Sequence, residues 1–182
     1  CKCSSDIPFT REATEYLYSL GHRRIAYIGS ECVMFFSAER KAGYQQALAE
    51  HNLQLDSDYC IEVDPLSLDH NEAFHALLER KDRPTAVVAS DDIFAVALER
   101  ACAQRGLSVP KDLSIVSFNN SLFARLTSPQ LTSIDVNSYQ LGIEAASQLI
   151  NHIENPNLLA TKIIVPHSLI IRDSCQQIGM ID

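Results

Sequence analysis

The stretch at residues 115–122, IVSFNNSL, decides how the rest of the chain is interpreted. Its apolar, β-branched run ends in two amides, Asn119 and Asn120, and a proline-interrupted segment then leads into a second extended run at 131–136. Amides that directly follow a buried strand lie at its carboxyl end, and in open parallel sheets this edge is where ligands bind. The stretch therefore predicts a receptor for a small molecule rather than a catalyst.

Helix-like and strand-like segments alternate along the whole chain. We expect strands at 24–29, 59–63, 84–89, 113–118, 131–136 and 169–172, and helices at 10–20, 37–51, 69–80, 91–104 and 138–154, with at most a short helix at 121–126. The strand runs do not alternate between apolar and polar residues, which is typical of parallel strands that helices cover on both faces. The predicted fold class is α/β, with a doubly wound parallel sheet.

Short polar residues are expected to cap several of these helices. Ser37 and Asp69 stand where two helices should begin, and Asp91 with Asp92 follows a strand and opens a third. Acidic side chains at such positions accept hydrogen bonds from free amides and complement the helix dipole. We therefore expect Asp91 and Asp92 to cap the helix rather than to form a paired-carboxylate acid–base site.

Length and charge narrow the class of protein. A chain of 182 residues suits one domain, or one domain with part of another. The formal net charge of −8 argues against direct binding of nucleic acid by this segment, because phosphate contacts need a basic face. No apolar run is long enough to span a bilayer, so we expect no membrane partner.

The six cysteines, at 1, 3, 32, 60, 102 and 175, lack the spacing of a zinc site. Cys60 and Cys102 lie in apolar segments, where a free thiol behaves as a small hydrophobic side chain. Reduced, structural cysteines favour a cytosolic protein, and disulfides in an exported protein are the alternative.

Motifs for nucleotide, nucleophilic or metal chemistry do not occur in the sequence. There is no G-x-G-x-x-G fingerprint, no phosphate-binding G-x-x-x-x-G-K-[ST] loop and no G-x-S-x-G elbow. The six histidines, at 22, 51, 70, 75, 152 and 167, show no spacing of a metal site or a catalytic triad. His22 follows a helix-ending glycine, where it is expected to cap the helix. We predict no enzyme activity, no metal site and no cofactor.

Three polar residues are candidates for ligand contact. Arg40 should lie in the first turn of its helix, where its fork of donors suits vicinal hydroxyls or a carboxylate. A solvated arginine paired with Glu39 or a nearby acid is an equal alternative. Ser90 stands at a strand tip. Asn119 offers both a donor and an acceptor, as a sugar hydroxyl requires, although the amides could instead cap the next short helix.

Five motifs follow one another along the chain: LGHRRIAYIG at 20–29, RKAGY at 40–44, VASDD at 88–92, VPKDLSIVSFNN at 109–120 and SPQLTSI at 128–134. Together they resemble the effector-binding domain of LacI/GalR-type bacterial transcriptional regulators, over residues 10–173. The resemblance implies a fold like that of periplasmic sugar-binding proteins, in which crossovers hinge two α/β lobes. This chain would hold the C-terminal lobe and one late helix of the N-terminal lobe.

The resemblance also implies boundaries within the chain. Residues 1–9 would be an incomplete crossover, 10–134 the C-terminal lobe, 135–162 a crossover with the helix of the N-terminal lobe, and 163–182 the return crossover, last strand and tail. A helix-turn-helix that reads operator DNA, and most of the N-terminal lobe, would lie upstream.

Partners and site residues follow from the same resemblance. A sugar effector would contact Arg40, Ser90 and Asn119. A homodimer would form through apolar residues of one helix and the following loop, of which half could instead face the sheet: Ile93, Phe94, Val96, Ala97, Leu122 and Phe123.

The amide pair departs from the commoner family pattern, which carries two aspartates there. The form SFNNS at 117–121 is similar to the maltose-operon repressors of Gram-positive bacteria, so maltose or a maltodextrin is the implied effector. Two alternatives remain. A periplasmic sugar-binding protein of an uptake system would share the fold, and an enzyme on a doubly wound sheet would need a nucleophile or metal set.

Overall fold

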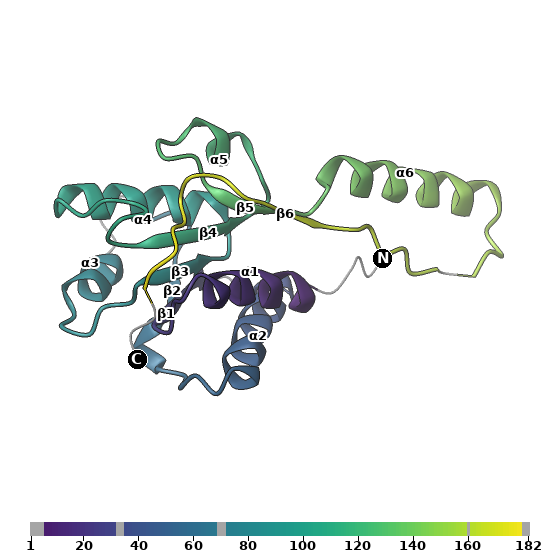
Figure 1. Cartoon of the computed structure of the whole chain (residues 1–182). Helices are drawn as coiled ribbons and strands as arrows, with labels where there is room; N and C mark the ends of the chain where they lie inside the picture. Colours follow the sequence, from purple (N-terminus) through teal and green to yellow (C-terminus); the bar gives the residue numbers. More distant parts are fainter. Residues whose placement is uncertain (1–5, 32–34, 69–71, 160, 180–182) are drawn as a thin grey trace.

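The strand-like runs form one six-stranded sheet in the computed structural model, which describes residues 6–31, 35–68, 72–159 and 161–179 (Figure 1). The strand order is β2-β1-β3-β4-β5-β6. The strands are β1 (Ile25–Ser30), β2 (Cys60–Val63), β3 (Ala86–Ala89), β4 (Ser114–Phe118), β5 (Thr132–Asp135) and β6 (Ser168–Ile170).

The first five strands are parallel to their neighbours, which confirms the predicted parallel sheet, and β6 runs antiparallel to β5. The reversal has a simple cause. The chain leaves the sheet at the carboxyl end of β5, passes through the helix α6 (Ser138–Glu154) and returns from that same edge (Figure 1). A strand entered from the carboxyl edge must run in the opposite direction.

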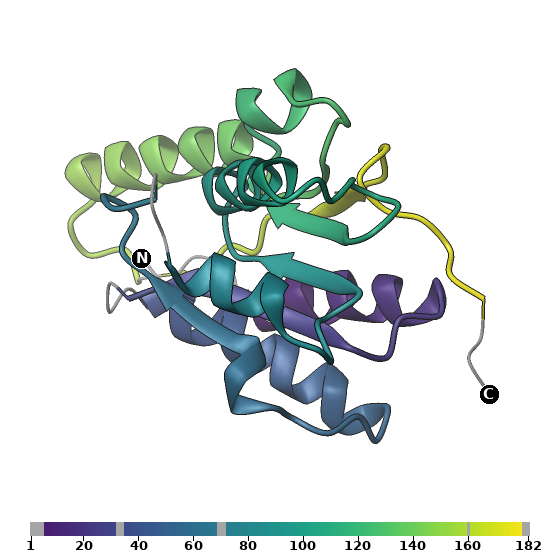
Figure 2. The ribbon, with the colours of Figure 1, turned by 90° about the vertical axis from the view of Figure 1, so that its left-hand side faces the viewer.

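Helices cover both faces of the sheet, as expected of a doubly wound fold. The helix α1 (Ile7–Ser19) packs with α2 (Phe35–Glu50) on one face, and α3 (Glu72–Glu79) packs with α4 (Asp92–Gln104) on the other. The turned view of Figure 2 shows the sheet between these layers. The remaining elements are the 3₁₀ helix η1 (Ser57–Tyr59) and the short helix α5 (Leu122–Leu126).

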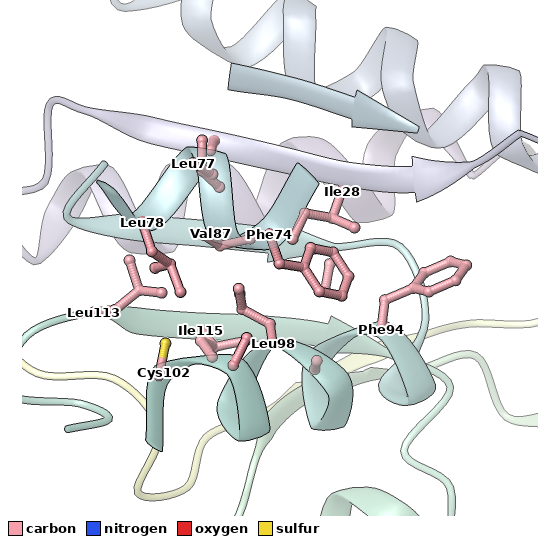
Figure 3. Close-up of a cluster of buried hydrophobic side chains, with 14 of the residues drawn as sticks. Ile28, Phe74, Leu77, Leu78, Val87, Phe94, Leu98, Cys102, Leu113 and Ile115 are labelled. Atoms are coloured by element: carbon pink, nitrogen blue, oxygen red, sulfur yellow. The ribbon is translucent and has the colours of Figure 1, made fainter. Parts of the chain in front are cut away.

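Neighbouring residues within one strand serve different cores. Val88 packs with α1 and α2, whereas Val87 packs with α3 and α4, because successive side chains of a strand point to opposite faces. Figure 3 shows Val87, together with Ile28 and Ile115, between side chains of α3 and α4. Both faces of the sheet are therefore apolar, which explains why its strand sequences do not alternate.

Two helix starts differ from the prediction. The helix α1 begins at Ile7 rather than Thr10, with Pro8 in its first turn, where a missing backbone N–H costs no hydrogen bond. The helix α2 begins at Phe35, so Ser37 lies inside it and does not cap it. The expected cap at Asp69 lies outside the described residues.

The tail after β6 crosses the amino ends of the central strands and closes them. The Ser174 hydroxyl donates to the carbonyl oxygen of Ile115 at 2.6 Å and accepts from the Thr132 amide at 2.8 Å. Gly21 adopts a positive φ of +99° against this tail, and a Cβ there would lie 2.6 Å from the carbonyl oxygen of Ile178. Only glycine suits this position.

His22 caps α1 through its backbone N–H, which donates to the carbonyl oxygen of Leu17 at 3.2 Å, but not through its side chain. It is 1% exposed, with Nε2 placed 3.2 Å from the carbonyl oxygen of Gln176 and Nδ1 placed 3.0 Å from the hydroxyl of Thr85. A neutral imidazole satisfies both contacts, donating from Nε2 and accepting at Nδ1. The ring therefore joins the tail to the sheet.

The helix α6 stands apart from both layers (Figure 1). No residue of α6 is buried. Large apolar side chains on it are more than 40% exposed, namely Tyr139, Ile143, Leu149, Ile150 and Ile153. An apolar helix without a covering surface is not stable alone in water, so α6 needs a partner.

The cysteines within the described residues are free thiols, namely Cys60, Cys102 and Cys175. Cys102 belongs to α4 and is 1% exposed in the core that α3 and α4 form with the sheet, as expected of a structural cysteine (Figure 3). None of the helices in the described ranges combines the length and the apolar character needed to cross a membrane.

We expect His22 to make stability depend on pH. Burial lowers the pKa of His22 below its ordinary value of 6.5, so the unfolded chain binds a proton more readily than the folded one. The stabilisation by His22 is therefore complete above pH 6.5 and is lost as the pH falls. Urea unfolding at about pH 7.5 and about pH 5.5 should show a steeper loss for the natural protein than for His22→Asn. Equal losses in the two proteins would contradict this assignment.

Candidate functional site

The three residues predicted to contact a ligand lie together at the carboxyl edge of the sheet. Ser90 directly follows β3 and Asn119 directly follows β4, while Arg40 lies in the first half of α2. The Arg40 guanidinium donates from Nη1 to the carbonyl oxygen of Ser90 and from Nη2 to the Asn119 side-chain oxygen, at 3.4 Å in the second case. The fold thus brings together residues 79 positions apart in the chain.

Arg40 is a buried cation with a partly buried anionic partner. Its side chain is 7% exposed, and Nε donates to Oδ2 of Asp6 at 2.7 Å. The guanidinium carbon lies 4.5 Å from the centre of the Phe118 ring, within the range of a cation–π contact. The alternative of a solvated arginine is wrong, because the Arg40 side chain is buried. Arg40 does pair with a nearby acid, but this is Asp6, and Glu39 accepts from the backbone N–H of Asp6. No motif pointed to Asp6.

Asn119 forms a bridge between a guanidinium and a carboxylate. Its oxygen accepts from Arg40, and its nitrogen donates to Oδ2 of Asp91 at 2.6 Å. An amide can do both, whereas a carboxylate at this position could not donate to Asp91. The neighbouring carboxylate of Asp91 thus favours an amide at position 119 over the commoner aspartate.

Asp91 has the predicted capping role and a second one. Its Oδ1 accepts from the backbone N–H of Ile93 at 3.0 Å, which confirms it as the cap of α4. Burial raises the pKa of the Asp91 carboxyl, and the hydrogen bond from Ile93 opposes this rise. Its other oxygen holds Asn119, so the cap also belongs to the polar group at the sheet edge.

Asp92 does not act as expected. It is completely buried, and its carboxylate accepts from the hydroxyls of Ser117 and Ser133 at 2.6 and 2.8 Å, and from the backbone N–H of Ser121 at 2.6 Å. Three donors compensate the loss of hydration of this buried charge. Asp92 thereby joins α4 to β4, β5 and the start of α5, and so holds these elements together at the carboxyl edge of the sheet.

Tyr27 brings a further hydroxyl to this edge, and the sequence patterns did not indicate it. The side chain is 1% exposed, and its hydroxyl lies 3.5 Å from the carbonyl oxygen of Ser37. Burial raises the pKa of Tyr27 to about 12, so the phenol stays neutral. Gly29 makes room for this ring, since a Cβ there would lie 2.7 Å from Cε1 of Tyr27.

The residues predicted to form a dimer interface divide into three groups by exposure. Ile93, Leu122 and Phe123 are exposed, by 39%, 61% and 54%. Val96 and Ala97 are half-buried and line a groove with Pro65, Leu66, Leu68, Ile93 and Arg100. Phe94 does not belong to this surface: it is 3% exposed and packs into the core between α4 and the sheet (Figure 3). Its position in the helix directs it to the sheet.

The described residues contain no group of three or more histidine, cysteine, aspartate or glutamate side chains placed to hold a metal ion. The side chains at the edge are a buried guanidinium, amides, hydroxyls and carboxylates. Such a set can recognise a polyhydroxylated molecule by direct hydrogen bonds.

Comparisons with known proteins agree with the fold. The family of periplasmic binding protein-like domains matches residues 14–175. The HTH-type transcriptional repressor PurR of Mannheimia succiniciproducens is 31% identical over 167 residues, which are 92% of this chain and 50% of PurR. The chain thus spans about half the length of this curated relative.

Solved structures match as well. A transcriptional regulator LacI from Bacillus cereus subsp. cytotoxis superposes with a TM-score of 0.90 at 38% identity, over 97% of this chain and 62% of that one. A complex of the transcriptional regulator CelR with cellobiose superposes with a TM-score of 0.86 at 29% identity, over 93% and 52% of the two chains. The chain therefore belongs to the periplasmic binding protein-like family, in the form of the effector-binding domain of LacI-family transcriptional regulators.

Proposed function

We propose that this chain is the sensing part of a transcriptional repressor, and that its effector is a neutral sugar of the maltose or maltodextrin type. The observation that carries the proposal is the meeting of Arg40, Ser90 and Asn119 at the carboxyl edge of a parallel sheet. Ligands bind at this edge in open α/β sheets.

The charges around Arg40 favour a neutral ligand. Asp6 lies 2.7 Å from the guanidinium and Asp91 lies 2.6 Å from the amide of Asn119, so two carboxylates accompany one cation. An anionic ligand would meet both carboxylates and would find the positive charge already balanced. A guanidinium has five N–H donors, so it retains capacity for a hydroxyl beside its bonds to Asp6, Ser90 and Asn119.

Two observations support a disaccharide. The matched structure of CelR contains cellobiose, and we extend this class of ligand to the present chain. The sequence SFNNS at 117–121 is similar to maltose-operon repressors, which favours maltose or a maltodextrin within that class.

The rest of the sensor is proposed from the exposed apolar surfaces. Because helix α6 buries none of its residues, we assign residues 135–162 to an N-terminal lobe that would complete the cleft. An upstream helix-turn-helix would bind operator DNA. The exposed Ile93, Leu122 and Phe123 fit a homodimer in the cytoplasm. A sugar that binds the closed arrangement of lobes more tightly than the open one would shift their equilibrium and so change operator affinity.

An uptake receptor of the periplasm has less support. It would share the fold and the cleft, but the three matched proteins described above are transcriptional regulators. These relatives likewise disfavour the enzyme alternative.

Replacing Arg40 tests the sensing role. In the protein with both lobes and the DNA-binding domain, Arg40→Gln should keep operator affinity but require about 10–100-fold more maltose for release, because charge-assisted hydrogen bonds are lost. Fluorescence anisotropy of labelled operator measures both properties. Arg11→Gln, at an exposed position on α1, is the matched control. Unchanged maltose sensitivity in Arg40→Gln would remove Arg40 from the effector site.

The charge of the ligand provides an independent test. Isothermal titration should show that maltose binds at least about tenfold more tightly than a maltose phosphate, because the phosphate would lie near Asp6 and Asp91. The preference should weaken at high salt, to the extent that these carboxylates are reached by solvent ions. Tighter binding of the phosphate would show that the effector is anionic.

Substitutions can distinguish the proposed dimer surface from the core beneath it. Phe123→Asp should weaken self-association at least about tenfold, because it places a charge in an apolar contact. Leu55→Asp, at an exposed leucine of another surface, should leave it unchanged. Phe94→Ala should instead lower the free energy of unfolding by about 3–5 kcal/mol, since it opens a cavity in the core.

Analytical ultracentrifugation measures the association of each variant, and urea unfolding measures its stability. A dimer that forms equally well with Phe123→Asp would place the interface elsewhere.

A further inference from the structure

We propose that Asn120 is a positioning residue that fixes the crossover between β5 and α6, and is not a second contact to the ligand. The inference deepens the proposed function and rests on it, because this crossover would be part of the hinge between the lobes. It is drawn from contacts of Asn120 that differ from those of Asn119, although the two residues are adjacent.

Asn120 bridges a second pair of opposite charges. Its side-chain oxygen accepts from Nη2 of Arg172, and its nitrogen donates to Oδ2 of Asp135 at 3.0 Å. Its backbone N–H donates to the hydroxyl of Ser133 at 3.0 Å. These three partners lie on β5 or just beyond β6, so Asn120 faces the strands that lead to and from α6.

Each end of this bridge holds one of the two segments that connect α6. Asp135 is the last residue of β5, and its Oδ1 accepts from the backbone N–H of Asn137 at 2.7 Å. Asn137 precedes the first residue of α6 and has a positive φ of 52°. Asp135 therefore holds the turn from which α6 departs.

Arg172 holds the returning segment. It follows β6, its Nη1 donates to the carbonyl oxygen of Leu131 at 2.6 Å, and its backbone N–H donates to the hydroxyl of Thr132 at 3.0 Å. Figure 1 shows β5 and β6 side by side where the chain passes to and from α6. Asn120 thus links the outgoing and the returning segments at one point.

The adjacent amides join this point to the ligand edge. Both have a positive φ, 93° for Asn119 and 45° for Asn120, and asparagine tolerates this region better than most residues. Arg40, Asn119 and Asp91 form one bridge, and Arg172, Asn120 and Asp135 form the next. A ligand that moves Asn119 therefore acts on a backbone that also carries the hinge contact.

The chemistry of the bridge predicts that the two side chains can be exchanged. With Asn120→Asp alone, the new carboxylate could still accept from Arg172, but it would lie against the carboxylate of Asp135. With Asp135→Asn alone, the single amide oxygen can face either Asn120 or the N–H of Asn137, so one bond is lost. With both changes, the carboxylate at 120 accepts from Arg172 and from the amide at 135, whose oxygen still accepts from Asn137.

The test is hydrogen–deuterium exchange, without sugar, of the protein with both lobes, for Asn120→Asp, Asp135→Asn and the double variant. Asn120→Asp should speed exchange in residues 132–141 by about tenfold, as expected for one hydrogen bond with a charged partner. Exchange in β1 should stay within about twofold, and the double variant should restore slow exchange, with the strong non-additivity expected of residues in contact. Asn157→Asp, at an exposed position after α6, controls for the added charge.

The outcomes are distinct. Unchanged exchange at 132–141 in Asn120→Asp, or a double variant worse than both single ones, would overturn the positioning role. Equal acceleration in β1 would show a general loss of stability and would overturn it too. The exchange measurement uses no sugar. If the protein with both lobes failed to bind maltose, that would therefore contradict the proposed effector but not the positioning role of Asn120.

Discussion

The buried guanidinium of Arg40 holds the carboxyl edge of this sheet together. It is largely shielded from solvent, and its charge is balanced because Asp6, the Ser90 carbonyl and the Asn119 amide surround it. These partners belong to the start of α1 and to the ends of β3 and β4. A buried cation that loses one partner is strongly destabilised, so each partner is constrained by the others. The same constraint orders the donors and acceptors that would meet the proposed ligand.

Two adjacent asparagines solve the same problem at two places. Each lies between an arginine and an aspartate, and each uses both ends of its amide. An aspartate pair would satisfy the arginines but would oppose Asp91 and Asp135. The replacement of the commoner aspartates thus fits the acidic neighbours, as well as removing charge from the ligand edge.

The molecule exposes two apolar surfaces within the residues that the structure describes. The helix α6 buries none of its residues, and a second apolar surface lies at Ile93, Leu122 and Phe123. Surfaces of this kind are typical of places where other protein covers them. In the proposed repressor, the first would pack in the second lobe and the second would meet another subunit. Movement at the crossover would then allow a bound sugar to change the distance between the DNA-binding domains of the two subunits.

The sequence by itself determined the α/β class, the parallel sheet and most of its elements, because the spacing of apolar residues and glycines along the chain reflects local secondary structure. It also indicated Arg40, Ser90 and Asn119, since residues after parallel strands must meet at one edge. Helix starts are less well determined by local pattern: Ser37 lies inside α2, which already begins at Phe35. Only the tertiary structure decided which partner each polar residue has. Asp6 beside Arg40, Asp92 beneath the edge, and Asp135 with Arg172 around Asn120 are contacts between distant segments. The resemblance places Phe94 among the candidate interface residues, but the rotation of α4 on the sheet directs it inward. Hydrogen bonds and burial depend on distances of a few ångströms between elements, and a linear pattern does not contain those distances.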